Sequence, residues 1–317
     1  MNLWQNYIRP KNLTEAMDTF ANAPRPLAPI AGGTDLLLDL EQGRHSPVQT
    51  LMDVTSIAEL NLLELRGDTL FIGAAVPVNR IVLDPLAVRH AQALTEACDL
   101  IAGPQVRNVA TLGGNVAHAL PAADGTIALL ALQAQAEIAS SAPAAVPSSV
   151  NTRRVPFEEL FLGPGKSSLK HGEELIVGFY IPIQKTLKVF AKHPRNEVEG
   201  AKTFRVSSCF KRIMRPQGVA LPILNCAVWL GRENDSIRDI RIAVGPGGGT
   251  PFRATHAEDV LHGQSANETI IESAFEALLA QAQFRTSARR AGAEYRRHIV
   301  RGLFKDTLDS ALERALR

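Results

Sequence analysis

Two glycine-rich turns contain the residues of this chain that are best suited to hold a ligand. The first runs from Ala31 through Gly32-Gly33-Thr34 to Asp35, and the second extends from Gln105 to Asn115 and ends in Thr-Leu-Gly-Gly-Asn. Glycine lets the backbone come close to a ligand, and the N–H groups of such a turn can donate hydrogen bonds to a phosphate. The pair of turns therefore predicts two sides of a site for one long, phosphate-bearing cofactor.

The second turn is the more informative of the two. The hydroxyl of Thr111 precedes Gly113-Gly114-Asn115, and the carboxylate of Asp124 follows Asn115 by nine residues. Backbone N–H donors suit a phosphate, whereas Asn and Asp side chains suit the hydroxyl groups of a ribityl or ribose chain. The first turn lacks the Gly-x-Gly-x-x-Gly spacing of a nicotinamide-binding Rossmann unit, so on its own it is equally consistent with a simple turn between a strand and a helix.

Regular elements must hold both turns in place, and the spacing of apolar residues together with the Gly and Pro breaks predicts their boundaries. In the first part of the chain we expect helices at 13–20, 35–40, 85–100 and 126–136, strands at 27–30, 51–54, 70–74, 137–139 and 174–181, and a surface loop at 140–151. In the second part we expect strands at 204–212, 224–230 and 237–244, followed by helices at 267–282 and 288–316. The first turn therefore joins a strand to a helix.

Composition limits the possible functions. A chain of 317 residues with 45% hydrophobic and 21% charged residues can bury a sizeable core, which predicts two domains. The formal charge of +2 and the 5% aromatic content disfavour nucleic acid as a partner. The N-terminus has no apolar signal core and no apolar run is long enough to cross a membrane, so we expect a cytoplasmic protein.

Metal and thiol chemistry are also disfavoured. The three cysteines, Cys98, Cys209 and Cys226, are odd in number and show no Cys-x-x-Cys spacing, which predicts reduced thiols. The eight histidines form no His-Glu-x-x-His motif, so we expect no metal in this chain. His118 lies just after the second turn and could face a cofactor, but a structural role is the simpler interpretation.

Both turns lie in segments that resemble the FAD-binding (medium) subunit of molybdenum hydroxylases, above all the separate flavin subunits of bacterial xanthine dehydrogenases. The residues that carry the resemblance are Ala31-Gly32-Gly33-Thr34-Asp35-Leu36-Leu37 and Ile101-Ala102-Gly103-Pro104-Gln105-Val106-Arg107-Asn108-Val109-Ala110-Thr111-Leu112-Gly113-Gly114-Asn115. Further similar segments are 51–54, 72–74, 161–165, 173–176, 210–211 and 249–254. The flavoprotein subunit of carbon monoxide dehydrogenase is a more distant relative. The resemblance covers nearly the whole chain.

The resemblance implies an α+β fold with two domains. Residues 1–183 would form a two-lobed FAD-binding domain of the PCMH/vanillyl-alcohol-oxidase type, with lobes of about 1–56 and 57–183. Residues 184–203 would form a linker. Residues 204–317 would form a smaller C-terminal domain of antiparallel sheet plus helices, of the CO dehydrogenase flavoprotein C-terminal type.

The resemblance also implies where FAD would bind. The first turn and the end of the strand before it would line the pyrophosphate through Pro29, Ile30, Ala31, Gly32, Gly33, Thr34 and Asp35. From the opposite side, the pyrophosphate and the ribityl chain would contact Thr111, Gly114, Asn115 and Asp124. Ile101 would lie against the reactive face of the flavin, and later strands would contribute Leu175, Ile176 and Lys211. A lysine near the flavin would stabilise the anionic reduced form, and a surface lysine at a strand edge is the alternative interpretation.

The implied function is electron transfer within a multi-subunit complex. A large partner subunit would carry the molybdenum cofactor at which the substrate is hydroxylated, and a small partner subunit would carry 2Fe-2S clusters. FAD in this chain would collect electrons from the clusters and pass them to an external acceptor such as NAD. Because the flavin supplies the redox chemistry, we expect no catalytic side chain.

Two other functions remain open from the sequence. One is a self-contained FAD-dependent oxidase or reductase, which would need its own substrate pocket and a proton donor that we do not find. The other is a flavin-free structural subunit of such a complex, because the segment from Arg215 to Pro222 lacks the Asp that family members commonly carry there. Turnover by the isolated chain would favour the first, and a colourless protein that takes up no FAD would favour the second.

Two further segments bear on partners. The linker between Ile183 and Phe204 is longer than is usual in the family, which predicts altered access or docking. Residues 285–317 carry eight Arg and one Lys against two Glu and two Asp. A solvated helix face is the simpler interpretation of this charge, and a docking face for an acidic partner subunit is the alternative.

Overall fold

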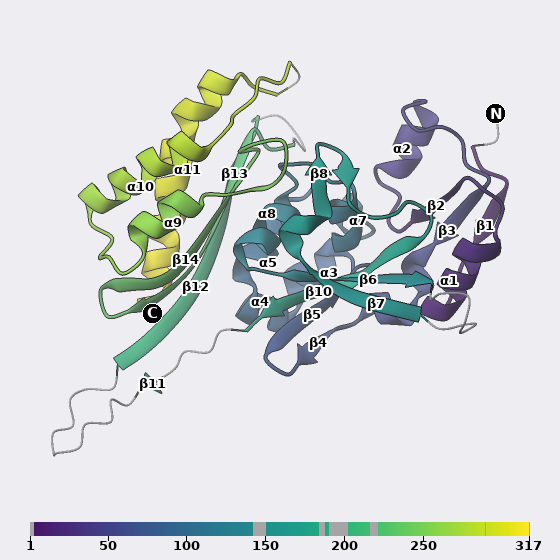
Figure 1. The fold of residues 1–317 in the computed structure, drawn as a ribbon, viewed down its shortest axis with the longest axis horizontal. Coiled ribbons are helices and arrows are strands. Elements are labelled where there is room, and N and C mark those ends of the chain that lie inside the picture. Colours follow the sequence, from purple (N-terminus) through teal and green to yellow (C-terminus); the bar gives the residue numbers. More distant parts are fainter. Residues whose placement is uncertain are drawn as a thin grey trace. The chain divides into compact units, whose positions relative to one another are not determined.

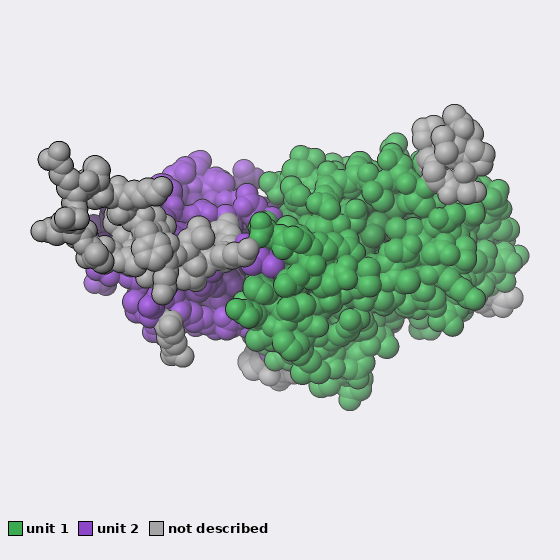
Figure 2. All heavy atoms as spheres, turned by 90° about the horizontal axis from the view of Figure 1, so that it is seen from below, with its two compact units in different colours: residues 1–90, 98–120, 134–182 green, residues 91–97, 121–133, 183–317 purple. Residues whose placement is uncertain are grey.

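The computed structural model describes residues 3–141, 150–183, 188–189, 202–215, 221–288 and 290–316. The chain forms two compact units, coloured green and purple in Figure 2. Unit 1 consists of residues 1–90, 98–120 and 134–182, and unit 2 of residues 91–97, 121–133 and 183–317. The units interleave along the sequence, because two short segments of the first half of the chain belong to unit 2. The predicted boundaries of two consecutive domains stay a prediction.

A three-stranded parallel sheet holds the first glycine turn (Figure 1). Its strand order is β1-β3-β2, with β1 at Asn6–Ile8, β2 at Leu27–Ile30 and β3 at Thr50–Asp53. Helix α1, Leu13–Asn22, begins where the side chain of Asn12 accepts a hydrogen bond from the N–H of Glu15. β2 leads through the turn into α2, Leu36–Glu41. The predicted order of strand, glycine turn and helix is confirmed.

The second sheet of unit 1 is antiparallel and has the order β4-β5-β10-β6-β7. Its strands are β4 at Leu63–Arg66, β5 at Thr69–Gly73, β6 at Gln135–Ser141, β7 at Val150–Pro156 and β10 at Glu174–Pro182. Single-turn 3₁₀ helices lie beside it at Ala58–Asn61 and Phe157–Leu160, and a third, Val54–Ser56, follows β3. The central strand β10 is buried from Glu174 to Ile181. Both of its faces are covered, so its apolar residues form a continuous run without alternation.

Short helices follow β5 and lead to the second glycine turn. They are α3 at Val78–Leu83, α4 at Pro85–His90, α5 at Gln92–Leu100, α6 at Pro104–Arg107 and α7 at Leu112–Ala117. The single helix predicted at 85–100 is therefore two helices, interrupted at Ala91, where the chain passes from unit 1 to unit 2. A hairpin of β8, Phe161–Gly163, and β9, Lys166–Ser167, lies beyond β7.

Unit 2 is built on an antiparallel sheet of order β11-β12-β13-β14-β15 (Figure 1). The strands are β11 at Lys188–Val189, β12 at Lys202–Ile213, β13 at Leu224–Glu233, β14 at Ser236–Gly245 and β15 at Phe252–Arg253. Its helices are α8 at Asp124–Ala131, α9 at Thr255–Leu261, α10 at Glu268–Gln281 and α11 at Ala293–Arg314. The three strands and two helices predicted for this part of the chain are confirmed as β12, β13, β14, α10 and α11, with shifted ends.

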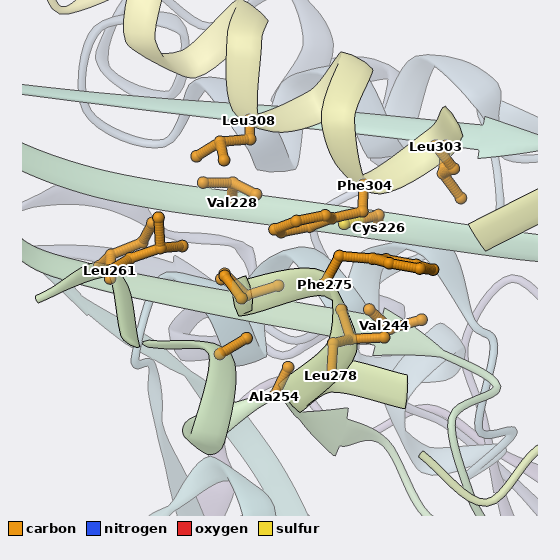
Figure 3. Close-up of a cluster of buried hydrophobic side chains, with 14 of the residues drawn as sticks. Cys226, Val228, Val244, Ala254, Leu261, Phe275, Leu278, Leu303, Phe304 and Leu308 are labelled. Carbon is orange, nitrogen blue, oxygen red and sulfur yellow. The ribbon is translucent and has the colours of Figure 1, made fainter. Parts of the chain in front are cut away.

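Helices cover both faces of this sheet. Cys226 and Val228 of β13 point into a buried core with Phe275 of α10 and Phe304 of α11, which Figure 3 shows. Asn225 is the neighbour of Cys226 in the strand and bonds to the start of α8, whose residues are all buried. Because successive residues of a strand point to opposite faces, β13 separates α8 from the α9–α11 layer.

Two further predictions differ from the structure by several residues. Helix α8 ends at Ala131 rather than at residue 136, because Gln133 has φ +55°, a left-handed conformation that ends a helix, and the chain then enters β6. Of the loop predicted at 140–151, residues 140–141 belong to β6 and residues 150–151 to β7, while residues 142–149 lie outside the described residues. Helix α9 was not predicted.

Candidate functional site

The first glycine turn leaves a row of backbone N–H groups without acceptors. Gly33 has φ +67°, a left-handed conformation that favours glycine. Within the described part of the chain, no acceptor takes the N–H of Gly32, Gly33 or Thr34, and the next bond runs from the N–H of Leu37 to the carbonyl of Gly33 at 3.0 Å. Successive free N–H groups form a concave donor surface. The turn can therefore donate several hydrogen bonds to an anionic group.

The second turn uses its backbone donors within the protein. The N–H groups of residues 112–115 donate to the carbonyls of Val76 and Ala74 and to the hydroxyl and carbonyl of Thr111, at 2.8 to 3.3 Å. The sequence suggested these N–H groups as ligand donors, but here they hold the turn together. The open group is the side-chain oxygen of Asn115, which is buried and has no hydrogen-bond partner among the described residues. A buried oxygen of this kind needs a donor.

The two turns pack directly against each other in unit 1. A Cβ added to Gly32 would lie 2.1 Å from the carbonyl oxygen of Val109 and 2.9 Å from the Cα of Ala110, so only glycine fits at this contact. Gly114 differs, because it is exposed and an added Cβ would meet only the hydroxyl of Thr111, at 3.2 Å. The structure thus brings the free N–H groups of the first turn next to the second turn, where the backbone of Gly114 is exposed.

The other predicted residues of unit 1 lie in or next to elements that adjoin these turns. Pro29 and Ile30 end β2, Ala31 and Asp35 flank the first turn, and Ile101 is half-buried in the loop between α5 and α6. Leu175 and Ile176 are buried in β10. Ala74 connects this strand to the second turn, because its N–H donates to the carbonyl of Val177 at 2.9 Å and its carbonyl accepts from Gly113 at 2.8 Å.

Asp124 belongs to unit 2, where it forms a buried ion pair. Its side chain is 5% exposed and accepts hydrogen bonds from Arg212 Nη1 at 2.5 Å and from Asn225 Nδ2 at 2.8 Å. Burial raises the pKa of Asp124, while the charge of Arg212 and the hydrogen bond from Asn225 act in the opposite direction. Asn225 also donates to the carbonyl of Ala122 at 3.1 Å, which fixes the start of α8. The carboxylate is therefore held rigidly by two strands.

Lys211 lies on the other face of β12 from Arg212. It pairs across the sheet with Cys226, which points into the α9–α11 layer, whereas Arg212 pairs with Asn225. The Lys211 side chain is half-buried and makes no hydrogen bond or ion pair within the described residues. The residue brought together with Asp124 is thus Arg212, the neighbour of the predicted lysine.

Sequence reasoning missed Arg212 and Asn225. Both are polar residues inside predicted strands, and their importance depends on the cross-strand register that pairs them. The period-two alternation of β12 was the available signal, because it places Lys211 and Arg212 on opposite faces. A cation next to a buried carboxylate is the usual arrangement, and Arg212 is the cation on the correct face.

Some sequence features lie outside the described residues or carry no site. Residues 216–220 of the altered segment after Arg215, and residues 184–187 and 190–201 of the linker, are not among the residues described.

Burial raises the pKa of Cys209 to about 11 and that of Cys226 to about 12, so both stay protonated near neutral pH. In the part of the chain that the structure describes, no group of three or more His, Cys, Asp or Glu residues could hold a metal ion. No helix of that part is long and apolar enough to cross a membrane.

Two protein-family models match the chain. Residues 3–184 match the FAD binding domain in molybdopterin dehydrogenase, and residues 208–311 match the CO dehydrogenase flavoprotein C-terminal domain. The domain formed by residues 3–184 is thus of a flavin-binding type. The chain belongs to the family of FAD-binding subunits of molybdopterin dehydrogenases, which are oxidoreductases. The predicted family, fold class and cofactor are confirmed.

Individual relatives match over nearly their full length. The xanthine dehydrogenase FAD-binding subunit of Escherichia coli O157:H7 is 32% identical over 311 residues, which cover 98% of this chain and 97% of the relative. The nicotine 6-hydroxylase medium subunit of Paenarthrobacter nicotinovorans is 31% identical over 306 residues, 96% of each chain. The structure of a carbon monoxide dehydrogenase from Hydrogenophaga pseudoflava superposes with a TM-score of 0.84 at 25% identity and covers 98% of both chains.

Proposed function

We propose that this chain holds FAD between its two glycine turns and transfers electrons within a molybdenum hydroxylase complex. The observation that carries the proposal is the row of free N–H groups at Gly32, Gly33 and Thr34, seated on Val109 and Ala110 of the second turn. A pyrophosphate is the group that such a row of donors would recognise in a dinucleotide cofactor.

The second turn fits the ribityl part of the same cofactor. The buried side-chain oxygen of Asn115 lacks a donor within the described residues, and a ribityl hydroxyl would supply one. Gly114 is exposed and leaves room for close approach of a ligand to the backbone. The hydroxyl of Thr111 caps α7 by accepting from the N–H of Gly114 at 3.1 Å, which keeps this open surface in place.

Further proposed contacts complete the site. In this proposal Pro29, Ile30, Ala31 and Asp35 add to the pyrophosphate side, Ile101 lies against the flavin, and Leu175, Ile176, Lys211 and Asp124 contribute from later elements. Asp124 is held by Arg212 and Asn225, so it would act as a fixed acceptor rather than as a mobile acid. Bound FAD would supply the redox chemistry, accepting electrons singly and releasing them in pairs. The protein's own residues bind and orient it.

The relatives support the proposed partners. They include medium subunits and FAD-binding subunits of xanthine dehydrogenase and nicotine 6-hydroxylase. By analogy, a large partner would carry the molybdenum cofactor, and a small partner would deliver electrons from 2Fe-2S clusters for transfer to an acceptor such as NAD. A cytoplasmic location is proposed on the three free cysteines, Cys98, Cys209 and Cys226, none of which forms a disulfide.

The electron route can be tested in the complex purified through a tag on this chain. The clusters are first reduced with titanium(III) citrate, excess reductant is removed, and NAD is added. We expect NADH to form in the wild-type complex but not in a Gly114→Val complex, whose partner subunits are unchanged. A dye that takes electrons directly from the clusters should be reduced by both complexes and serves as the control. Equal NADH formation by both complexes would overturn the proposed route.

A further inference from the structure

The loop between α5 and α6 is held in a rarely populated conformation. Ala102 has φ +48°, in the left-handed region that residues other than glycine seldom adopt. Such a conformation persists only where the surrounding structure holds it. Ile101, the residue before it, is the one proposed to lie against the flavin. The position of Ile101 therefore depends on whatever fixes this loop.

Arg107 is the residue that fixes it. From the end of α6 its Nη1 atom donates to the carbonyls of Ile101 at 3.2 Å and of Ala102 at 2.9 Å. Its Nη2 atom lies 3.6 Å from Oδ1 of Asp99, at the end of α5, and its side chain is only 15% exposed. One guanidinium thus ties together the end of α5 and the two loop residues that follow.

Arg107 is also close in sequence to the two residues that support the first turn. Val109 and Ala110, against which Gly32 packs, both donate their N–H groups to the carbonyl of Val106, at 3.1 and 2.8 Å. Arg107 therefore lies between the loop that carries Ile101 and the backbone that supports the first turn. All of these residues belong to unit 1.

We infer that Arg107 is a positioning residue of the FAD site. It fixes the positions of Ile101 and of the backbone at Val109 and Ala110, which supports the first turn, without touching the cofactor. The inference rests on the proposed function. Arginine suits this task because its planar fork can serve two carbonyls and a carboxylate at once, whereas lysine is a single point charge. Lysine at this position should therefore keep only part of the contribution of Arg107 to FAD binding, and glutamine should keep none of it.

The test compares Arg107→Gln and Arg107→Lys with wild type in the purified chain, using FAD itself as the probe. Arg80→Gln is the matched control, because Arg80 also lies in unit 1 and donates to one backbone carbonyl, that of Asn61, at 2.7 Å. We expect Arg107→Gln to weaken FAD binding by about tenfold or more, since two charged hydrogen bonds are lost. Its visible circular dichroism should also change, with Arg107→Lys intermediate and Arg80→Gln unchanged.

A double-mutant cycle separates positioning from general destabilisation. If Arg107 acts in part through Ile101, then Arg107→Gln should weaken FAD binding by a smaller factor in an Ile101→Ala background than in wild type. Hydrogen exchange of amides 101–103 in the FAD-free chain should be faster in Arg107→Gln, and this measurement needs no bound cofactor. Unchanged affinity and dichroism in Arg107→Gln, or full additivity in the cycle, would overturn the inference alone. Failure of the wild type to bind FAD would overturn the proposed function and the inference together.

Discussion

Gly32 and Gly114 lack side chains for different reasons. At Gly32 the constraint is internal, because an added Cβ would overlap the carbonyl oxygen of Val109 at 2.1 Å. Gly32→Ala should therefore lower the free energy of unfolding by about 3 kcal/mol, the cost of overpacking against rigid backbone. The measurement is urea denaturation of the FAD-free chain. Gly163→Ala, where an added Cβ would meet nothing within 4 Å, is the control, and equal losses in the two variants would contradict the packing argument.

Removing one partner of the buried ion pair between Asp124 and Arg212 should lower the stability of the protein strongly. Both side chains are nearly inaccessible, at 5% and 6% exposure, so Arg212→Ala would leave a buried carboxylate without its cation. We expect a loss of about 3–5 kcal/mol in the free energy of unfolding, measured by denaturant titration. Lys305→Ala removes an exposed pair with Asp309 and should cause no measurable loss. Similar stability of the two variants would show that the buried pair does not form.

The sequence alone identified the glycine turns but not how each would be used. The N–H groups of residues 112–115 find acceptors in Val76, Ala74 and Thr111, and two of these acceptors come from a distant segment. Only the fold shows that these donors are taken while those of the first turn are free. Arg212 and Asn225 were missed for the same reason, since their meeting with Asp124 depends on the pairing of β12 with β13.

At the scale of elements, Asp53 joins β1 to the end of β3. Its carboxylate accepts hydrogen bonds from Tyr7 at 2.8 Å and from the N–H and hydroxyl of Thr55 at 2.9 and 2.6 Å, and it pairs with Arg9 at 3.0 Å. Burial alone would raise the pKa of Asp53, but the bonds from Thr55 and Tyr7 and the charge of Arg9 outweigh it and lower the pKa. The ionised carboxylate is therefore stabilised in the folded state.

This shift predicts how stability depends on pH. Because the folded pKa of Asp53 lies below the unfolded value of about 4, its contribution is fully present above that value and is lost as the pH falls through the folded pKa. Asp53→Asn should lower stability at neutral pH and flatten the loss of stability in the acid range. Denaturant titrations from neutral to acid pH provide the measurement. A variant that loses stability with acid as steeply as wild type would contradict the assignment.

Elements were easier to predict than their ends. The long apolar alternation of β12, β13 and β14 was sufficient to locate each strand, because each has one side on a buried core. The end of α8 was not predicted, since it depends on the left-handed φ of Gln133, which carries no glycine signal. The break at Ala91 inside the predicted helix 85–100 likewise coincides with the passage between the two units, which local periodicity cannot reveal.

At the scale of the whole molecule, the basic C-terminal segment has fewer free charges than its composition indicates. Within unit 2, Arg301 pairs with Glu272, Lys305 with Asp309 at 2.6 Å, and Arg314 with Glu96 at 2.5 Å. These pairs favour a solvated helix face stabilised within the unit. The docking of an acidic partner on this segment stays a prediction.

The central claim is that the two glycine turns hold FAD, and the FAD content of the purified chain tests it most directly. Gly114→Val is the sharpest variant, because Gly114 is exposed and an added Cβ would meet only the hydroxyl of Thr111, at 3.2 Å, whereas a bound cofactor would leave it no room. Wild type should carry, or take up, one FAD per chain and show the visible absorption bands of oxidised flavin. Gly114→Val should unfold at a similar denaturant concentration yet bind none. A wild-type chain that stays colourless after incubation with FAD, or a Gly114→Val chain that retains FAD at one per chain, would contradict the account.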